Sequence, residues 1–210
     1  LTITGTDPAT VVELMMINAA TSGAVALNTE TIATAYTDTA ANLISAFTGI
    51  TALTGALTVS DTEPVTITNL NTIDTYTSGA TRALATSEIT GSATDLATSL
   101  AAKTYDGNVA LTITGNDAAT IAEIISINSM TSGNVTLNAE TIAANLGGTA
   151  SDIAAAFDGI TTSTSTLTIT GSTLATVAQL KTINAATSGT VVLNSQTIAA
   201  NLSGSAVDLA

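Results

Sequence analysis

Two kinds of short segment with alternating hydrophobic and polar residues recur along the chain. The first kind occurs at 1–5 (LTITG), 57–61 (LTVSD), 111–115 (LTITG) and 167–171 (LTITG). The second kind occurs at 24–28 (AVALN), 80–84 (ATRAL), 134–138 (NVTLN) and 190–194 (TVVLN). A period of two residues is typical of half-buried strands, so we predict a β-strand at each of these positions.

Hydrophobic residues follow a helical period between the two strands of each section. The segments are PATVVELMMINAAT, VTITNLNTIDTYT, AATIAEIISINSMT and LATVAQLKTINAAT. Three of them open with the Thr-x-x-Glu/Gln capping pattern, at Thr10–Glu13, Thr120–Glu123 and Thr176–Gln179. Asp7 and Asp117 are alternative caps one turn earlier, and the pattern does not choose between them. The Ser-Gly pair that follows predicts a left-handed helix end at Gly23, Gly79, Gly133 and Gly189.

A longer segment, which we call the return segment, connects the second strand to the second helix. We expect it to be irregular or briefly extended, with its Ile and Leu side chains pointing inward. A second helix comes next, and its predicted capping pairs are Thr39–Asn42, Ser92–Asp95, Thr149–Asp152 and Ser205–Asp208. The two strand–helix half-units are about 23 and about 32 residues long.

The whole pattern repeats, which predicts the fold class. The repeats span 1–56, 57–110, 111–166 and a truncated 167–210. About four units of ~55 residues, each made of two strand–helix half-units, favour parallel strands joined by helical crossovers. Alternation turns Leu111 and Ile113 toward the helices and Thr112 and Thr114 away from them. We therefore predict a single α/β solenoid array over 1–210, leucine-rich-repeat-like, with its helices on one face of the sheet; a doubly wound globular sheet is the alternative.

Composition narrows the functional classes. The chain has 210 residues, no Cys or His, 3 Lys+Arg, 16 Asp+Glu and a formal net charge of −13. So few cations cannot neutralise a row of phosphates, which argues against nucleic-acid partners. No stretch has the roughly 18 uninterrupted apolar residues of a membrane span, so we expect no membrane insertion. We expect an extracellular or cell-surface protein, and the sequence has the form of a piece of a longer or processed polypeptide.

The candidate metal ligands are Asp7, Asp61 and Asp117, which lie in the turns after the first strand. Carboxylates in loops beside backbone carbonyls suit calcium, although the fourth repeat has no acid there and the chain has no EF-hand loop. We explain the other repeated acids, Asp95 and Asp152, as helix caps. No other cofactor is expected.

Catalysis is not expected, because the chain lacks His and Cys and most of its acids fall on capping positions. The repeated threonines offer a different surface, a Thr-bearing sheet face that could bind ice or glycans. Threonine is also simply a good strand former, and Arg82 and Val192 interrupt its rows. Asn134 and Asn201 begin N-glycosylation sequons, which short sequences often contain by chance.

The motifs INAATSG (183–189) and TIAANLSGSAVDLA (197–210) carry a resemblance that covers the whole chain. The chain resembles tandem-repeat segments of very large cell-surface proteins of marine cyanobacteria, S-layer- or adhesin-like, and structural proteins of related phages. The resemblance implies an extracellular surface-layer, adhesin or filament role, in surroundings where calcium is common.

We therefore expect a structural protein that forms a surface layer, fibre or filament by continuous or head-to-tail stacking. Its expected partners are copies of itself or flanking repeats of a longer chain, with glycans as further candidates. The alternative is an adhesin or an ice- or glycan-binding module.

Overall fold

The computed structural model describes residues 1–50, 52–160 and 163–200, which form two compact units. Unit 1 comprises Leu1–Thr90 and Ser99–Val109, and unit 2 comprises Gly91–Thr98 and Ala110–Ala210. The helices are α1 (Val11–Ala19), α2 (Thr29–Ala33), α3 (Ala40–Phe47), α4 (Ile67–Asp74), α5 (Ala93–Ser99), the 3-10 helix η1 (Leu100–Ala102), α6 (Ile121–Ser129), α7 (Ala139–Ala143), α8 (Ala150–Ala156), α9 (Val177–Ala186) and α10 (Ser195–Ala199). The strands are β1 (Tyr36–Asp38), β2 (Leu57–Val59), β3 (Val65–Thr66), β4 (Thr81–Ala83), β5 (Glu88–Gly91), β6 (Thr104–Tyr105), β7 (Ala110–Ile113), β8 (Val135–Thr136), β9 (Asn145–Gly148), β10 (Thr166–Ile169) and β11 (Val191–Val192).

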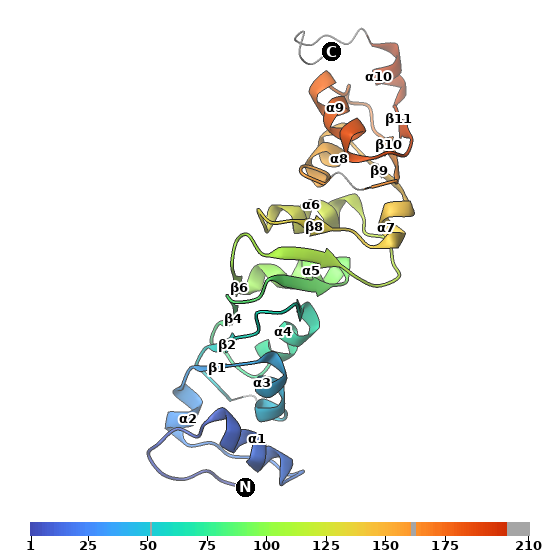
Figure 1. Ribbon diagram of the computed structural model, residues 1–210. Coiled ribbons are helices and arrows are strands. Elements are labelled where there is room, and N and C mark those ends of the chain that lie inside the picture. The colour runs from blue at the N-terminus through green and yellow to red at the C-terminus, as the bar shows by residue number, and fades with distance from the viewer. Residues whose placement is uncertain (51, 161–162, 201–210) are drawn as a thin grey trace. The chain divides into compact units, whose positions relative to one another are not determined.

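Unit 1 contains a parallel sheet with strand order β1-β2-β4-β6. Tyr36 pairs with Leu57, and Leu57 pairs with Thr81, so each partner lies roughly 21–24 residues further along the chain. Strand β3 pairs with β5 in the same parallel sense. Helix α3 packs against both α1 and α4, and Figure 1 shows these three helices side by side.

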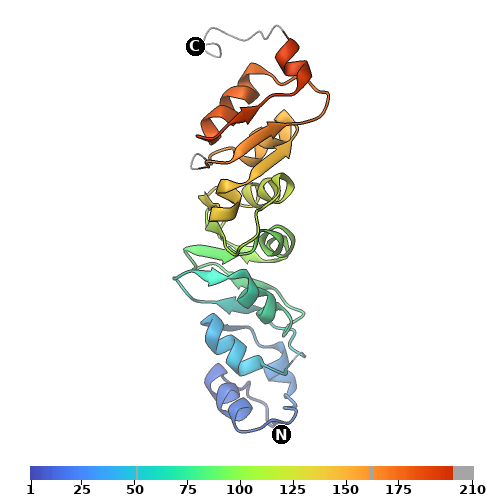
Figure 2. The same cartoon turned by 90° about the vertical axis from the view of Figure 1, so that its right-hand side faces the viewer.

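Unit 2 repeats this arrangement. Strand β10 lies between β9 and β11, and β7 pairs with β8, all in parallel. Helix α8 packs against α6 on one side and α9 on the other, as can be followed in Figures 1 and 2. Small parallel sheets with packed helices confirm the predicted α/β class. How the two units join, and with it the prediction of one array over 1–210, is not tested by these contacts.

The predicted strands vary in how fully they form. Three of the LTITG-type segments contain β2, β7 and β10, whereas 1–5 makes a single bridge from Thr2 to Ala26. The return segments are more regular than expected. They hold the short helices α2, α7 and α10 and the strands β1, β5 and β9.

The main helices lie where the hydrophobic period predicts them. Their N-caps show which of the two predicted capping residues is used. Thr10, Thr120 and Thr176 each form a complete capping box with the Glu or Gln three residues later. The alternative caps at Asp7 and Asp117 are therefore wrong. The pairs at Thr39, Ser92 and Thr149 also form, whereas the pair Ser205–Asp208 lies outside the described residues.

The glycines after the main helices do not have the predicted left-handed conformation. In the described part of the chain, positive φ occurs instead at Gly5, Gly49, Gly115, Gly159 and Gly171. In the TSG corners, the Thr Oγ1 accepts the glycine N–H, for example from Gly79 to Thr77 at 2.8 Å. A Cβ on Gly79 would lie 2.7 Å from the carbonyl oxygens of Thr54 and Gly55. Close backbone approach, and not a positive φ, therefore requires glycine here.

The core is mainly aliphatic and follows the predicted strand faces. Leu111 is 0 % exposed and Ile113 is 2 % exposed, while Thr114 is exposed. The inward orientation predicted for the return segments is correct for Leu146 but wrong for Ile198, which is 69 % exposed. A threonine of the same segment is buried instead, as described below.

Candidate functional site

Asp7 and Asp117 occupy equivalent exposed turns in the two units. Each turn is fixed through its backbone, because the carbonyl oxygens of Asp7 and Asp117 accept hydrogen bonds of 2.9 Å from Asn28 Nδ2 and Asn138 Nδ2. The amides hold the turns, so the two carboxylates are not needed for their shape.

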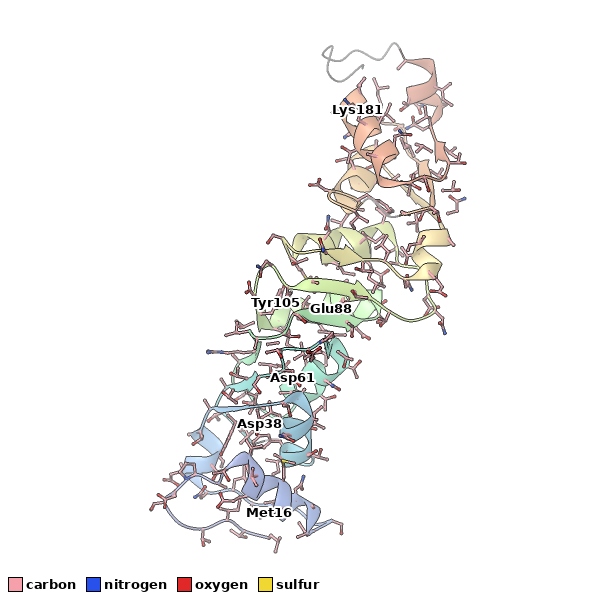
Figure 3. The ribbon with its side chains drawn as sticks, viewed as in Figure 1. Met16, Asp38, Asp61, Glu88, Tyr105 and Lys181 are labelled. Atoms are coloured by element: carbon pink, nitrogen blue, oxygen red, sulfur yellow. The ribbon has the colours of Figure 1, made fainter. Side chains whose placement is uncertain are left out.

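Asp61 acts as a cap on helix α3. Its Oδ2 accepts the backbone N–H of Ala40 at 2.7 Å. The neighbouring Asp38 accepts from the N–H of Thr39 at 2.8 Å and from Asn42 Nδ2 at 2.7 Å. Figure 3 shows Asp38 and Asp61 in unit 1. Negative charge at a helix N-terminus is favourable, which gives both carboxylates a structural role.

The assignment of Asp7, Asp61 and Asp117 as calcium ligands stays a prediction. Within 1–50, 52–160 and 163–200, no group of three or more acidic side chains could hold a metal ion. The acids interpreted as helix caps behave as predicted, since Asp95 and Asp152 bond the hydroxyls of Ser92 and Thr149 at 2.7 Å. Asp208 lies outside the described residues.

A polar motif that the sequence reasoning missed connects successive half-units. In the motif LN-x-x-T, Asn138 Oδ1 caps helix α7 by accepting the N–H of Thr141, while Asn138 Nδ2 donates to the carbonyls of Gly115 and Asp117. The buried Thr141 hydroxyl accepts the N–H of Ala119 at 2.7 Å. We call this arrangement the Asn–Thr clip. Its members are Asn28–Thr31, Asn138–Thr141 and Asn194–Thr197.

The recurrence of LN-x-x-T-I-A at 27–33, 137–143 and 193–199 was the available signal for these clips. The second repeat has Leu84 in place of the asparagine, and this side chain is 51 % exposed. Thr86 there makes different bonds, to the carbonyls of Glu63 and Glu88.

A second asparagine connects two helices that pack against each other. Asn18 Nδ2 donates to the carbonyls of Ser45 and Thr48, both at 3.0 Å, at the end of α3. In unit 2, Asn128 does the same with Ala155 and Asp158. Carbonyls that a helix end leaves without a partner are thereby satisfied.

The second repeat replaces this asparagine by Asp74, which forms an ion pair. Lys103 Nζ lies 2.7 Å from Asp74 Oδ2, with the lysine side chain 4 % and the aspartate side chain 39 % exposed. Asp74 Oδ1 accepts the Thr81 hydroxyl at 2.7 Å. Burial raises the pKa of Asp74, but the hydrogen bonds and charge of Lys103, with Thr81, outweigh it and leave the pKa below its usual value.

Two equivalent cavities lie at the corners. One, of about 380 Å³, is lined by Asn18, the Thr21–Gly23 turn and the Thr48–Ile50 turn. The other, of about 370 Å³, is lined by Asn128 and the corresponding turns of unit 2, including Asp158. Both linings include hydroxyls and an asparagine amide, and each amide donates to backbone carbonyls of the neighbouring turn.

The Thr-bearing strand face is interrupted in the register. Thr112 pairs with Thr136, but Thr58 pairs with Arg82 and Thr168 with Val192. Thr168 also donates its hydroxyl to Asn145 Oδ1 at 3.0 Å. An array of equivalent free hydroxyls is thus not formed along these strands.

In the described part of the chain, no helix has the length and hydrophobicity to cross a membrane. In comparisons with protein-family models, curated proteins and solved structures, nothing matches this chain.

Proposed function

We propose that this chain is a structural α/β solenoid segment of an extracellular surface layer, fibre or filament, and that stacking of its coils is its function. The observation that carries the proposal is the parallel pairing of strands roughly 21–24 residues apart, found separately in each unit. A repeating offset of this kind is what successive coils of a solenoid require.

The side-chain hydrogen bonds support the same interpretation. The Asn–Thr clips and the Asn18 and Asn128 bonds all run between consecutive half-units. Polar side chains here satisfy backbone groups of the neighbouring coil and are not gathered into a pocket. Such bonds stabilise stacking and supply no catalytic group.

Extracellular placement is supported by the net charge of −13 with only 3 Lys+Arg among 210 residues. An acidic surface with few charges of either sign keeps repeated copies dispersed until specific contacts form.

Negative-stain electron microscopy of the 210-residue chain tests the proposal. Ordered fibres or lattices are expected. Dispersed particles that bind glycans or show thermal hysteresis would favour the adhesin or ice-binding alternative. A hydrolytic activity abolished by one Asp or Glu substitution would overturn the structural role.

A further inference from the structure

Asn134 is an asparagine whose side chain the fold does not use. The asparagines that recur between repeats, such as Asn18, Asn128 and Asn138, donate their side-chain amides to backbone carbonyls. Asn134 is exposed, and within the described part of the chain its side chain makes no hydrogen bond. Its position is held by the backbone, because its carbonyl oxygen accepts the N–H of Leu111 at 2.9 Å. The side-chain amide is therefore available for another purpose.

The two residues after Asn134 complete an N-glycosylation sequon. Asn134-Val135-Thr136 has the form Asn-x-Thr, in which x is not proline. Val135 and Thr136 form strand β8, where Val135 pairs with Leu111 and Thr136 with Thr112. Side chains alternate along an extended chain, so Asn134 and Thr136 share one side, and both residues are exposed. The amide and the hydroxyl of the sequon are thus accessible from the same direction.

Asn134 also lines the corner cavity of unit 2, together with Asp158, Thr131 and Ser132. The cavity volume of about 370 Å³ lies near the lower end of the range of about 300–1,000 Å³ for small-molecule sites, which suits a single sugar ring. In the described part of the chain, the carboxylate of the exposed Asp158 makes no hydrogen bond. A carboxylate is an acceptor, and a sugar hydroxyl next to Asn134 is a donor that matches it.

The equivalent corner of unit 1 has a cavity of nearly the same size, about 380 Å³, with a different lining. The asparagine, the carboxylate and the sequon threonine of unit 2 are replaced in unit 1 by Ala24, Thr48 and Ala26. The corner therefore forms without these three groups. Their presence together in unit 2 indicates a role other than folding.

We propose that Asn134 is an N-glycosylation site and that the first sugar of its glycan lies in the cavity beside Asp158. Asn134 Nδ2 forms a bond to the anomeric carbon of a glycan carried on a lipid diphosphate. The bond between that carbon and the diphosphate oxygen breaks, the lipid diphosphate leaves with the electron pair, and the amide releases one proton. A glycosyltransferase of the exporting cell catalyses this step. The inference rests on the proposed extracellular placement, because glycosylated sequons belong to exported chains.

The first test is mass spectrometry of the chain isolated from the cells that make it. Lys103 and Lys181 are successive basic residues, so trypsin releases residues 104–181 as one peptide with a single sequon. The mass of this peptide should exceed that of its sequence by the mass of a glycan, and fragmentation should place the glycan on Asn134. A peptide of unmodified mass would overturn the proposal.

The second test changes Thr136 in the same cells. Thr136→Ala should remove the glycan although Asn134 is still present, whereas Thr136→Ser should keep it, because the sequon accepts either hydroxyl residue. Thr136 is exposed, so both variants should fold, which circular dichroism checks. Equal modification of the two variants would contradict glycosylation through the sequon.

A matched control builds the same sequon in unit 1. Ala24 and Ala26 are both exposed, as Asn134 and Thr136 are, so the double variant Ala24→Asn with Ala26→Thr should carry a second glycan. If position 24 is modified and Asn134 is not, the transferase reaches such a corner and does not use the natural sequon. That result would overturn the proposal.

The variant Asp158→Thr tests where the first sugar lies, because it gives unit 2 the residue of unit 1. In the glycosylated wild-type chain, hydrogen exchange in the turn 131–134 should be about tenfold slower than in Thr136→Ala, since a hydrogen bond to a charged group contributes at least that factor. Asp158→Thr should keep the glycan and lose this protection. Protection that persists in Asp158→Thr would show that Asp158 does not hold the sugar.

The outcomes separate this inference from the proposed function. Fibres or lattices formed by a chain without a glycan would overturn the glycosylation site and leave the structural function standing. A chain that carries the glycan on Asn134 and stays dispersed would support the site and contradict the structural function.

Discussion

Phe47 in unit 1 lies among aromatic rings, with ring centroids 5.2 Å from Tyr36 and 6.5 Å from Tyr76. Phe157 holds the same repeat position in unit 2, but Leu146 and Ala186 stand where the two tyrosines would be. Both phenylalanines are almost completely buried. The phenylalanine at this position is thus equally buried beside aromatic and beside aliphatic neighbours in the sequence pattern.

The polar contacts of the second repeat differ from those that unit 2 makes at the equivalent positions. Unit 2 uses Asn128, whose neutral amide bridges two carbonyls, whereas the second repeat in unit 1 uses the Asp74–Lys103 ion pair. Likewise Asn138 forms an Asn–Thr clip, whereas Leu84, the equivalent residue of the second repeat, is exposed. The comparison teaches that equivalent positions of the sequence are held by different contacts, some neutral and some charged.

The largest effect is expected from truncating the two phenylalanines. Phe47→Ala and Phe157→Ala should each lower the free energy of unfolding by about 3–5 kcal/mol, because each leaves a cavity. Phe47→Ala should cost about 1 kcal/mol more, since it also loses the tilted ring contacts. Urea unfolding followed by hydrogen exchange in each unit measures the difference. Equal costs would show that the rings add nothing beyond their buried area.

A smaller but still large effect is expected at Gly55, whose equivalent in unit 2 is Ser165. A Cβ on Gly55 would lie 1.9 Å from the Thr34 carbonyl oxygen, so Gly55→Ala should destabilise unit 1 by about 2–3 kcal/mol. Ser165 already carries a Cβ and donates to the Thr141 carbonyl at 2.7 Å. Ser165→Ala should cost only about 1 kcal/mol. Thermal unfolding of both variants measures the two costs. A larger cost for Ser165→Ala than for Gly55→Ala would contradict the equivalence of the two positions.

The Asn–Thr clip predicts a difference between Asn138 and Leu84. Asn138→Ala removes a helix cap and the donor to two carbonyls, and should lower the free energy of unfolding by about 2 kcal/mol. Leu84→Ala at the equivalent exposed position should change it by less than about 0.5 kcal/mol. Denaturant midpoints compare the two. If Leu84→Ala lowers the free energy of unfolding as much as Asn138→Ala does, the position contributes to stability without the Asn–Thr clip.

The smallest expected effect concerns pH and the ion pair of unit 1. The pKa of folded Asp74 is lowered, so its contribution is present above the unfolded pKa of about 3.9 and is lost as pH falls through the folded pKa. Asp74→Asn should flatten the acid side of the stability profile of unit 1. The matched variant in unit 2, Asn128→Asp, introduces an aspartate without a lysine that corresponds to Lys103. It should therefore not create a similar dependence of stability on pH. If Asp74→Asn loses stability at acid pH as the wild type does, the ion pair does not explain the pH dependence of unit 1.

Much of the local structure could be predicted because its causes lie close together in the sequence. The capping boxes at Thr10, Thr120 and Thr176 need only residues three positions apart, and the hydrophobic period places each main helix. The predicted strands at 111–115 and 167–171 formed for the same reason. Parallel pairing followed from the length of the half-units.

The candidate site was predicted less well. Asp61 sits in the predicted turn, but its carboxylate bonds the Ala40 N–H across 21 residues. No local pattern reveals such a partner, so the sequence did not predict that Asp61 caps α3. The glycines of the TSG corners were misinterpreted for a related reason: the backbone that approaches Gly79 belongs to Thr54 and Gly55, which are distant in the sequence.

The sequence by itself determined the repeat, the helices with their caps, and the alternation that buries Leu111 and Ile113, because these depend on spacing along one segment. The tertiary structure alone decided what the recurring polar side chains do. Asn18, Asn138 and Lys103 find their partners roughly 20–30 residues away, so only folding brings donor and acceptor together and lets these side chains connect segments that are distant in the sequence.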